Sequence, residues 1–178
     1  GVLAAALGGL HLLLRPRTST DIAAQIARAS FADAHPLTPV DLSWYAGVHP
    51  YGYSLLSPYV MDAVGIGLTG LLAAVAAAVL LARLLRDAAH PRWGAALGAV
   101  FAVANVVSGR TTFALGAVAA LAALVLLPRR LPAAVAAMLS GLLSPVAAAF
   151  LGLAAAVLVL KRLPGGWTTG LAASIPVA

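Results

Sequence analysis

Side chains that could take part in catalysis are scarce in this sequence, and several of them lie in one stretch, residues 15–58. Within it, Asp21 opens a segment in which Ile22, Ile26 and Ala29 recur at i, i+4 and i+7, the spacing of one helical face. We expect a short amphipathic helix there, with one of the two hydroxyl residues before Asp21 as its N-cap. A carboxylate at this point could accept a proton from an attacking hydroxyl group. It could equally serve only the helix N-terminus, whose dipole favours negative charge.

A second carboxylate and a dense aromatic run follow in the same stretch. Asp41 precedes Trp44, Tyr45, His49 and Tyr51, in a segment rich in glycine and proline. Aromatic faces edged with hydroxyl and imidazole groups suit the binding of sugar rings. The same residues are also typical of the aromatic belt at a membrane interface. The sequence leaves both interpretations open.

Three other charged residues could contribute. Arg28 lies in the amphipathic segment and Arg110 between two apolar segments, and either guanidinium could bind a phosphate group. Asp62 lies inside an apolar segment, where ionisable groups are rare and costly and therefore mark candidate functional positions. Snorkelling to the interface or a structural ion pair would explain Asp62 and Arg110 equally well.

Several common chemistries lack the residues they need. The chain has no cysteine, its 5 acidic residues are all aspartates, and no HExxH motif, DxD motif or glycine-rich phosphate loop is present. We therefore expect no metal site, no cofactor and no nucleotide hydrolysis.

The composition indicates the environment in which these residues lie. Hydrophobic residues make up 62% and charged residues 9% of the 178, and the mean hydropathy is +1.01. Soluble domains carry roughly 25% charged residues, so the composition predicts an integral membrane protein and excludes a soluble enzyme, a coiled coil and a disordered tail. The net charge of +6 does not predict nucleic-acid binding, because the basic residues lie in small groups between apolar runs.

We expect an all-α, polytopic transmembrane fold of about six helices with short helical hairpins, in which residues 1–178 form a single transmembrane domain. The expected apolar segments are 1–14, 59–85, 93–107, 111–127 and 131–160. The last would measure about 45 Å as one helix, beyond the ~30 Å hydrocarbon core. Ser144-Pro145 should therefore divide it into helices 132–143 and 145–160. Since the first segment is too short to cross a bilayer, we also expect the chain to be part of a longer protein.

The distribution of Lys and Arg predicts an orientation. If residues 15–58 form an extracytoplasmic loop, seven of the 11 basic residues lie on the cytoplasmic side and four on the outer side, as the positive-inside rule requires. The cytoplasmic set is Arg83, Arg86, Arg92, Arg129, Arg130, Lys161 and Arg162. We expect a multi-pass protein of the plasma membrane.

Together these features resemble the GT-C class of polytopic membrane glycosyltransferases, and more narrowly the N-terminal membrane part of actinobacterial mannosyl- and arabinosyltransferase-like proteins. The resemblance rests on an aspartate just after the first apolar helix, the amphipathic segment, the loop Trp-Tyr-x-Gly-x-x-Pro-x-x-Tyr and the short hairpins. Ser-Gly-Arg-x-x-Phe-x-x-Gly at 108–116 and Leu-Ser-Pro-Val-Ala at 143–147 add to it.

The resemblance implies transfer of a sugar from a polyprenyl-phosphate donor to an extracytoplasmic hydroxyl, with membrane lipids and a glycan or lipid acceptor as partners and no nucleic acid. It implies that Asp21 is the general base, although Asp41 competes for that role. Arg110 or Arg28 would then bear the charge of the lipid phosphate. The expected sugar-binding residues are Trp44, Tyr45, His49 and Tyr51.

Two other classes of protein remain open. A membrane transporter or lipid flippase would use Asp62 and Arg110, with helices broken around Ser144-Pro145. A non-catalytic membrane subunit would use the aromatic loop as a docking surface.

Overall fold

The chain is described here by a computed structural model, which covers residues 1–14, 21–41, 54–161, 169 and 172. Over these ranges it contains eight helices and no strands. They are α1 (Val2–Leu14), α2 (Ile22–Ala34), α3 (Ser57–Val64), α4 (Ile66–Leu84), α5 (Pro91–Val107), α6 (Thr111–Val125), α7 (Arg130–Leu143) and α8 (Pro145–Leu160). The all-α prediction is confirmed: α2 is the expected amphipathic helix, and the other helices correspond to the six expected apolar ones, with the segment 59–85 divided into α3 and α4.

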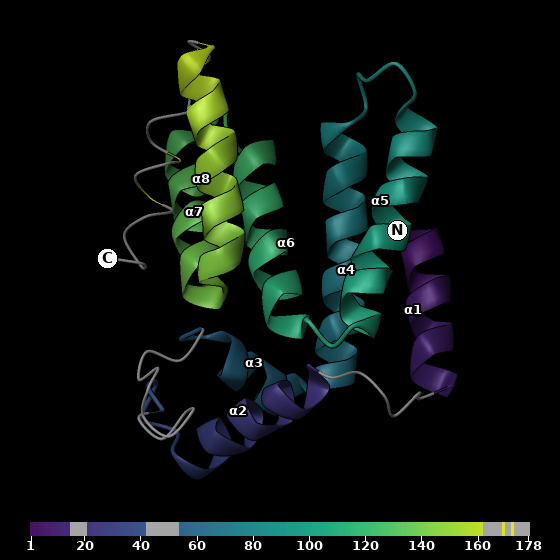
Figure 1. Cartoon of the computed structure of the whole chain (residues 1–178). Coiled ribbons are helices and arrows are strands. Elements are labelled where there is room, and N and C mark those ends of the chain that lie inside the picture. Colours follow the sequence, from purple (N-terminus) through teal and green to yellow (C-terminus); the bar gives the residue numbers. More distant parts are fainter. Residues whose placement is uncertain (15–20, 42–53, 162–168, 170–171, 173–178) are drawn as a thin grey trace.

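Helices α4 to α8 run alternately in opposite directions and are joined by short connections, with α1 packed against α4 and α5 (Figure 1). Helices α2 and α3 pack on each other and lie across one end of this set. The α5–α6 turn and the α7–α8 break are at the same end as α2 and α3. The α4–α5 connection and the last turn of α8 are at the opposite end. Among the described basic residues, those of the expected outer set therefore belong to one end of the bundle and those of the expected cytoplasmic set to the other; they are Arg28 and Arg110 on one side, and Arg83, Arg86, Arg92, Arg129, Arg130 and Lys161 on the other.

The predicted division of residues 131–160 is confirmed. Ser144 is extended, with φ −160° and ψ 109°, and its hydroxyl accepts a hydrogen bond from the Ala147 amide at 3.3 Å. Pro145 is the first residue of α8, where its missing amide proton costs no helical hydrogen bond. The helix break therefore combines a serine N-cap with a proline at N1.

The expected continuous segment 59–85 was wrong, because Gly65 divides it. Gly65 has φ +85° and ψ 138°, a conformation that side-chain-bearing residues rarely adopt. Its amide donates to the Met61 carbonyl at 2.9 Å and closes α3, and α4 begins at the next residue. Asp62 consequently lies in the short helix α3 and not within the long helix α4.

One of the described helices, α4, is long and apolar enough to cross a bilayer by length and composition. Helices α1, α5, α6, α7 and α8 are also apolar, but each has fewer residues than are needed to cross a bilayer by the same measure. The all-helical fold is thus established, and the multi-pass arrangement remains a prediction.

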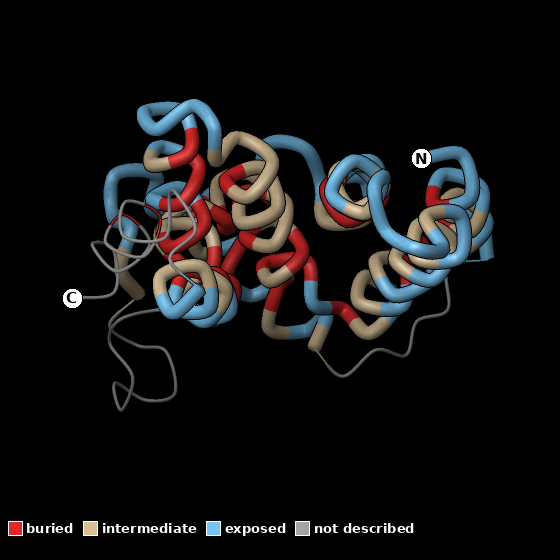
Figure 2. Tube along the Cα trace, turned by 90° about the horizontal axis from the view of Figure 1, so that it is seen from above, coloured by how far each residue is buried: buried red, intermediate tan, exposed pale blue. Residues whose placement is uncertain are grey.

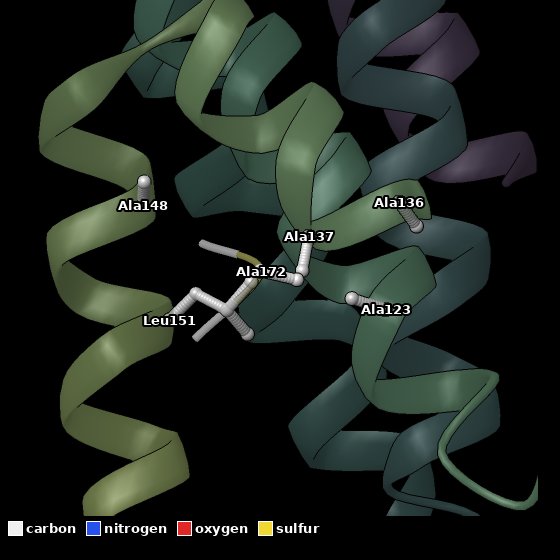
Figure 3. Packing of buried hydrophobic residues seen from close by; sticks show 6 residues of the cluster. All are labelled: Ala123, Ala136, Ala137, Ala148, Leu151 and Ala172. Atoms are coloured by element: carbon white, nitrogen blue, oxygen red, sulfur yellow. The ribbon is translucent and has the colours of Figure 1, made fainter. Parts of the chain in front are cut away.

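The interior is built from small side chains. Among the described residues, the buried hydrophobic side chains are alanines apart from Met61, Val103 and Leu151. One cluster joins α6, α7 and α8 around Leu151 and Ala137 (Figure 3), and a second joins α1, α4 and α5. Large apolar side chains point outward instead: Trp93 is 73% and Phe101 71% exposed. Figure 2 shows the buried positions gathered where helices face one another.

Candidate functional site

Two polar side chains of α2, Gln25 and Arg28, are buried, and Asp21 at the start of the helix lies on the same face. Asp21, Gln25 and Arg28 recur at i, i+4 and i+7; Gln25 and Arg28 are each 6% exposed, whereas Ile26, on the other side of the helix, is 51% exposed. Sequence periodicity identified the helix itself. The expected apolar face is divided, however, because Ala29 is buried while the two isoleucines remain exposed.

Asp21 is itself the N-cap residue of α2, which corrects the expectation that a preceding hydroxyl residue holds that position. Its carboxylate makes no capping hydrogen bond to the helix. Instead, Oδ2 of Asp21 accepts a hydrogen bond from Nε of Arg110 at 3.3 Å. Both side chains are accessible to solvent, with 46% of the Asp21 and 64% of the Arg110 side chain exposed. The pair therefore joins the start of α2 to the turn between α5 and α6 and stays open to a ligand.

The position of Arg110 is fixed by the way α5 ends. Gly109 has φ +82°, and its amide donates to the Val106 carbonyl at 2.9 Å. The Arg110 amide donates to the Asn105 carbonyl at 3.2 Å, which completes a Schellman motif. The Asn105 side-chain amide also donates to the Arg110 carbonyl at 3.4 Å. The Ser-Gly-Arg sequence thus forms a defined turn that presents the guanidinium at the tip of the α5–α6 hairpin.

Two buried contacts hold α2 in place beside this turn. The Thr112 hydroxyl donates to Oε1 of Gln25 at 2.5 Å, one helical turn from Asp21. Arg28 donates from Nη2 to the Ser54 carbonyl at 2.9 Å. The Ser54 hydroxyl in turn donates to the Leu142 carbonyl at the end of α7, at 3.3 Å. The sequence predicted no role for Gln25 or Thr112, because a single glutamine or threonine does not form a recognisable sequence motif.

A cavity of about 460 Å³ lies between α4, α5 and α6 and includes Arg110 in its lining. We call it the Arg110 cavity. Its polar lining residues, Asn105, Ser108 and Arg110, belong to the end of α5 and the turn that follows. The rest of the lining is apolar and extends along the three helices to Ala77, Leu81 and Leu121. The cavity is therefore a long apolar space with a cation at one end.

The other predicted site residues lie elsewhere. Arg28 and Asp41 both line a small cavity of about 20 Å³, two turns along α2 from Asp21. Asp62 is exposed and lines none of the cavities described here. Trp44, Tyr45, His49 and Tyr51 fall outside the described residues. Within the described ranges, the structure thus brings together Asp21 and Arg110 and leaves Arg28, Asp41 and Asp62 apart from them.

The described residues contain no group of three His, Cys, Asp or Glu side chains arranged to hold a metal ion. Comparison of the chain with protein-family models, with curated proteins and with solved structures gives no match.

Proposed function

We propose that this chain is a membrane glycosyltransferase of the GT-C type, which moves a sugar from a polyprenyl-phosphate donor to an extracytoplasmic acceptor hydroxyl. The observation that carries the proposal is the Asp21–Arg110 pair, whose arginine also lines a long apolar cavity. This reaction needs a base, a phosphate-binding cation and a space for a lipid chain, and Asp21, Arg110 and the Arg110 cavity are the proposed counterparts of these three elements.

The distribution of side-chain size supports placement in a membrane. Helices in a bilayer associate through small residues, because the lipid is as apolar as leucine and large apolar side chains can face it without cost. The alanine interior and the exposed Trp93, Phe101, Phe150 and Leu153 follow that pattern. A water-soluble bundle would bury such side chains. We assign the protein to the plasma membrane, with α2, α3 and the α5–α6 turn on the outer side.

The Arg110 cavity is the proposed site of the donor lipid. The prenyl chain would occupy the apolar space between α4, α5 and α6, and its phosphate would lie beside the guanidinium of Arg110. Charge-assisted hydrogen bonds from arginine to phosphate are strong and directional. A cation in this place also stabilises the negative charge that the departing phosphate acquires.

Asp21 is the proposed general base. Its carboxylate takes the proton of the acceptor hydroxyl while the hydroxyl oxygen forms a bond to the anomeric carbon. The bond between that carbon and the phosphate oxygen breaks, and the polyprenyl phosphate leaves with the electron pair. Because Asp21 and the donor phosphate both bind Arg110, arrival of the donor would draw the guanidinium away from the carboxylate and leave it free to accept the proton.

Binding of polyprenyl phosphate to the full chain in lipid nanodiscs tests the donor site. Arg110→Gln should weaken binding about tenfold or more, the effect of losing a charged hydrogen bond worth ~1.5–3 kcal/mol. Arg86→Gln is the matched control, since Arg86 is also an exposed arginine paired with an aspartate, Asp87, at the opposite end of the bundle. Equal affinity in the two variants would contradict the assignment of Arg110. Loss of solute transport in Asp62→Asn, with no effect of Asp21→Asn, would favour a transporter instead.

A further inference from the structure

A second cavity, of about 550 Å³, lies on another side of α4 and belongs to neither the donor site nor the small Arg28 cavity. We call it the His11 cavity. It is lined by His11 and Leu12 of α1, Ile22 of α2, Val64 of α3, the segment 65–68 at the start of α4, Val106 of α5, and Gly109 and Thr111 beside the α5–α6 turn.

This cavity lies beside the same ion pair as the donor site. Ile22 directly follows Asp21 in the chain, and Gly109 and Thr111 directly flank Arg110. Residues 106–111 thus separate two apolar cavities. Arg110 lines one of them, and its two neighbours, Gly109 and Thr111, line the other. A group transferred between ligands in the two cavities would pass the Asp21–Arg110 pair.

The lining of the His11 cavity differs in charge from the lining of the Arg110 cavity. Among the residues that the structure describes, its lining contains no lysine, arginine, aspartate or glutamate, and the side-chain hydrogen-bonding groups of these residues are those of His11 and Thr111. A phosphate placed there would meet no Lys or Arg side chain among the described lining residues, and an unpaired charge in apolar surroundings is costly. A neutral ligand with a long apolar part and a hydroxyl group suits this lining.

The break between α3 and α4 contributes to this space. Beyond its chain neighbours, a Cβ atom added to Gly65 would meet no atom of the described residues within 4 Å, so glycine is required there by its φ of +85° and not by crowding. At Gly67, by contrast, an added Cβ would lie 3.0 Å from Cδ2 of Leu12, which shows how closely α1 approaches α4. The cavity is therefore open at the helix break and bounded by α1.

We infer that the His11 cavity binds the apolar chain of a neutral, hydroxyl-bearing lipid, and that this lipid is the acceptor of the transferred sugar. The inference rests on the proposed function and commits the acceptor to a lipid instead of a water-soluble glycan. The hydroxyl would lie toward Asp21, while the donor phosphate approaches Arg110 from the other cavity.

Native mass spectrometry of the full chain, loaded with diacylglycerol and polyprenyl phosphate together, tests the inference. The wild-type chain should retain one molecule of each. Leu68→Trp, which fills the His11 cavity, should lower retention of diacylglycerol about tenfold by displacing several methylene groups, and should leave polyprenyl phosphate bound. Leu72→Trp is the matched control, because Leu72 is an exposed leucine one turn further along α4 that lines neither cavity.

The outcomes separate the two proposals. Competition between the lipids for one place, or loss of diacylglycerol to the same extent in both tryptophan variants, overturns the acceptor site and leaves the donor site standing. Failure of diacylglycerol to bind the wild-type chain overturns it as well. Failure of polyprenyl phosphate to bind contradicts the proposed function itself. Val64→Trp, which fills the cavity from α3, replaces Leu68→Trp if that variant does not fold.

Discussion

The Thr112 hydroxyl donates a hydrogen bond to Oε1 of Gln25 at 2.5 Å, in a buried position one helical turn from the Asp21–Arg110 pair. This contact joins α2 to the first turn of α6, two residues after Arg110. Because both partners are buried, the bond fixes the rotation of α2 and, with it, the direction in which Asp21 points. The exposed ion pair is therefore held by a buried neutral contact and not by its own electrostatic attraction, which is weak between solvent-exposed groups.

Thr112→Val should destabilise the protein by about 1–3 kcal/mol, because Gln25 Oε1 would lose its buried donor. Thr112→Ser, which keeps the hydroxyl, should cost less. Thermal unfolding in detergent measures both effects. Equal stability of the valine variant and the wild type would show that the contact does not hold α2 against α6.

Gly116→Ala should be destabilising, because an added Cβ would lie 2.4 Å from Cβ of Ser144 and 2.9 Å from Cβ of Ala147. Overpacking of this kind typically costs about 1–3 kcal/mol. Gly152→Ala, in α8, is the matched control. Outside the nearby backbone of its own helix, no atom of the described residues lies within 4 Å of an added Cβ, so the higher helix propensity of alanine should stabilise α8 by up to ~1 kcal/mol. A neutral effect at Gly116 would contradict the close approach of α6 and α8.

Ala104→Phe should reduce binding of polyprenyl phosphate, because Ala104 lines the Arg110 cavity and the larger side chain would occupy space assigned to the prenyl chain. Val100→Phe, one turn earlier on α5, is exposed and does not line that cavity, so it should bind the lipid like the wild type. Affinity measured in nanodiscs distinguishes the two. Full binding by Ala104→Phe would place the lipid elsewhere.

The proposed orientation is open to a labelling experiment, since the chain has no cysteine of its own. A cysteine at His35 should react with a membrane-impermeant maleimide added to intact cells, and a cysteine at Asp87 should react only after permeabilisation. Both positions are exposed in the structure. Labelling of the two positions from the same side, or with the order reversed, would contradict an outward-facing α2 and any chemistry on the outer face.

Much of the helical arrangement could be predicted because hydropathy and proline position act locally. The division at Ser144-Pro145 follows from a serine that caps and a proline that begins a helix. The division at Gly65 was missed, because a single glycine in an apolar run gives no signal of its φ value. The juxtaposition of Asp21 and Arg110 was expected from their shared interface level. The supporting contacts through Gln25 and Thr112 depend on how α2 is rotated about its axis. Local periodicity did not predict this rotation, because the side of α2 that carries Gln25 faces the bundle and the side that carries the isoleucines does not.

Transfer of radiolabelled mannose or arabinose from its polyprenyl-phosphate donor, measured with the full chain in lipid vesicles, tests the central claim most directly. The comparison is between Asp21→Asn and Asp33→Asn, since Asp33 is an exposed aspartate on the same helix, away from Arg110. Loss of a general base typically costs about 10²–10⁴-fold in rate. We predict a loss in that range for Asp21→Asn, with polyprenyl phosphate still bound, and wild-type transfer for Asp33→Asn. Unchanged transfer by Asp21→Asn, or an equal loss in both variants, would contradict the assignment of Asp21 as the base.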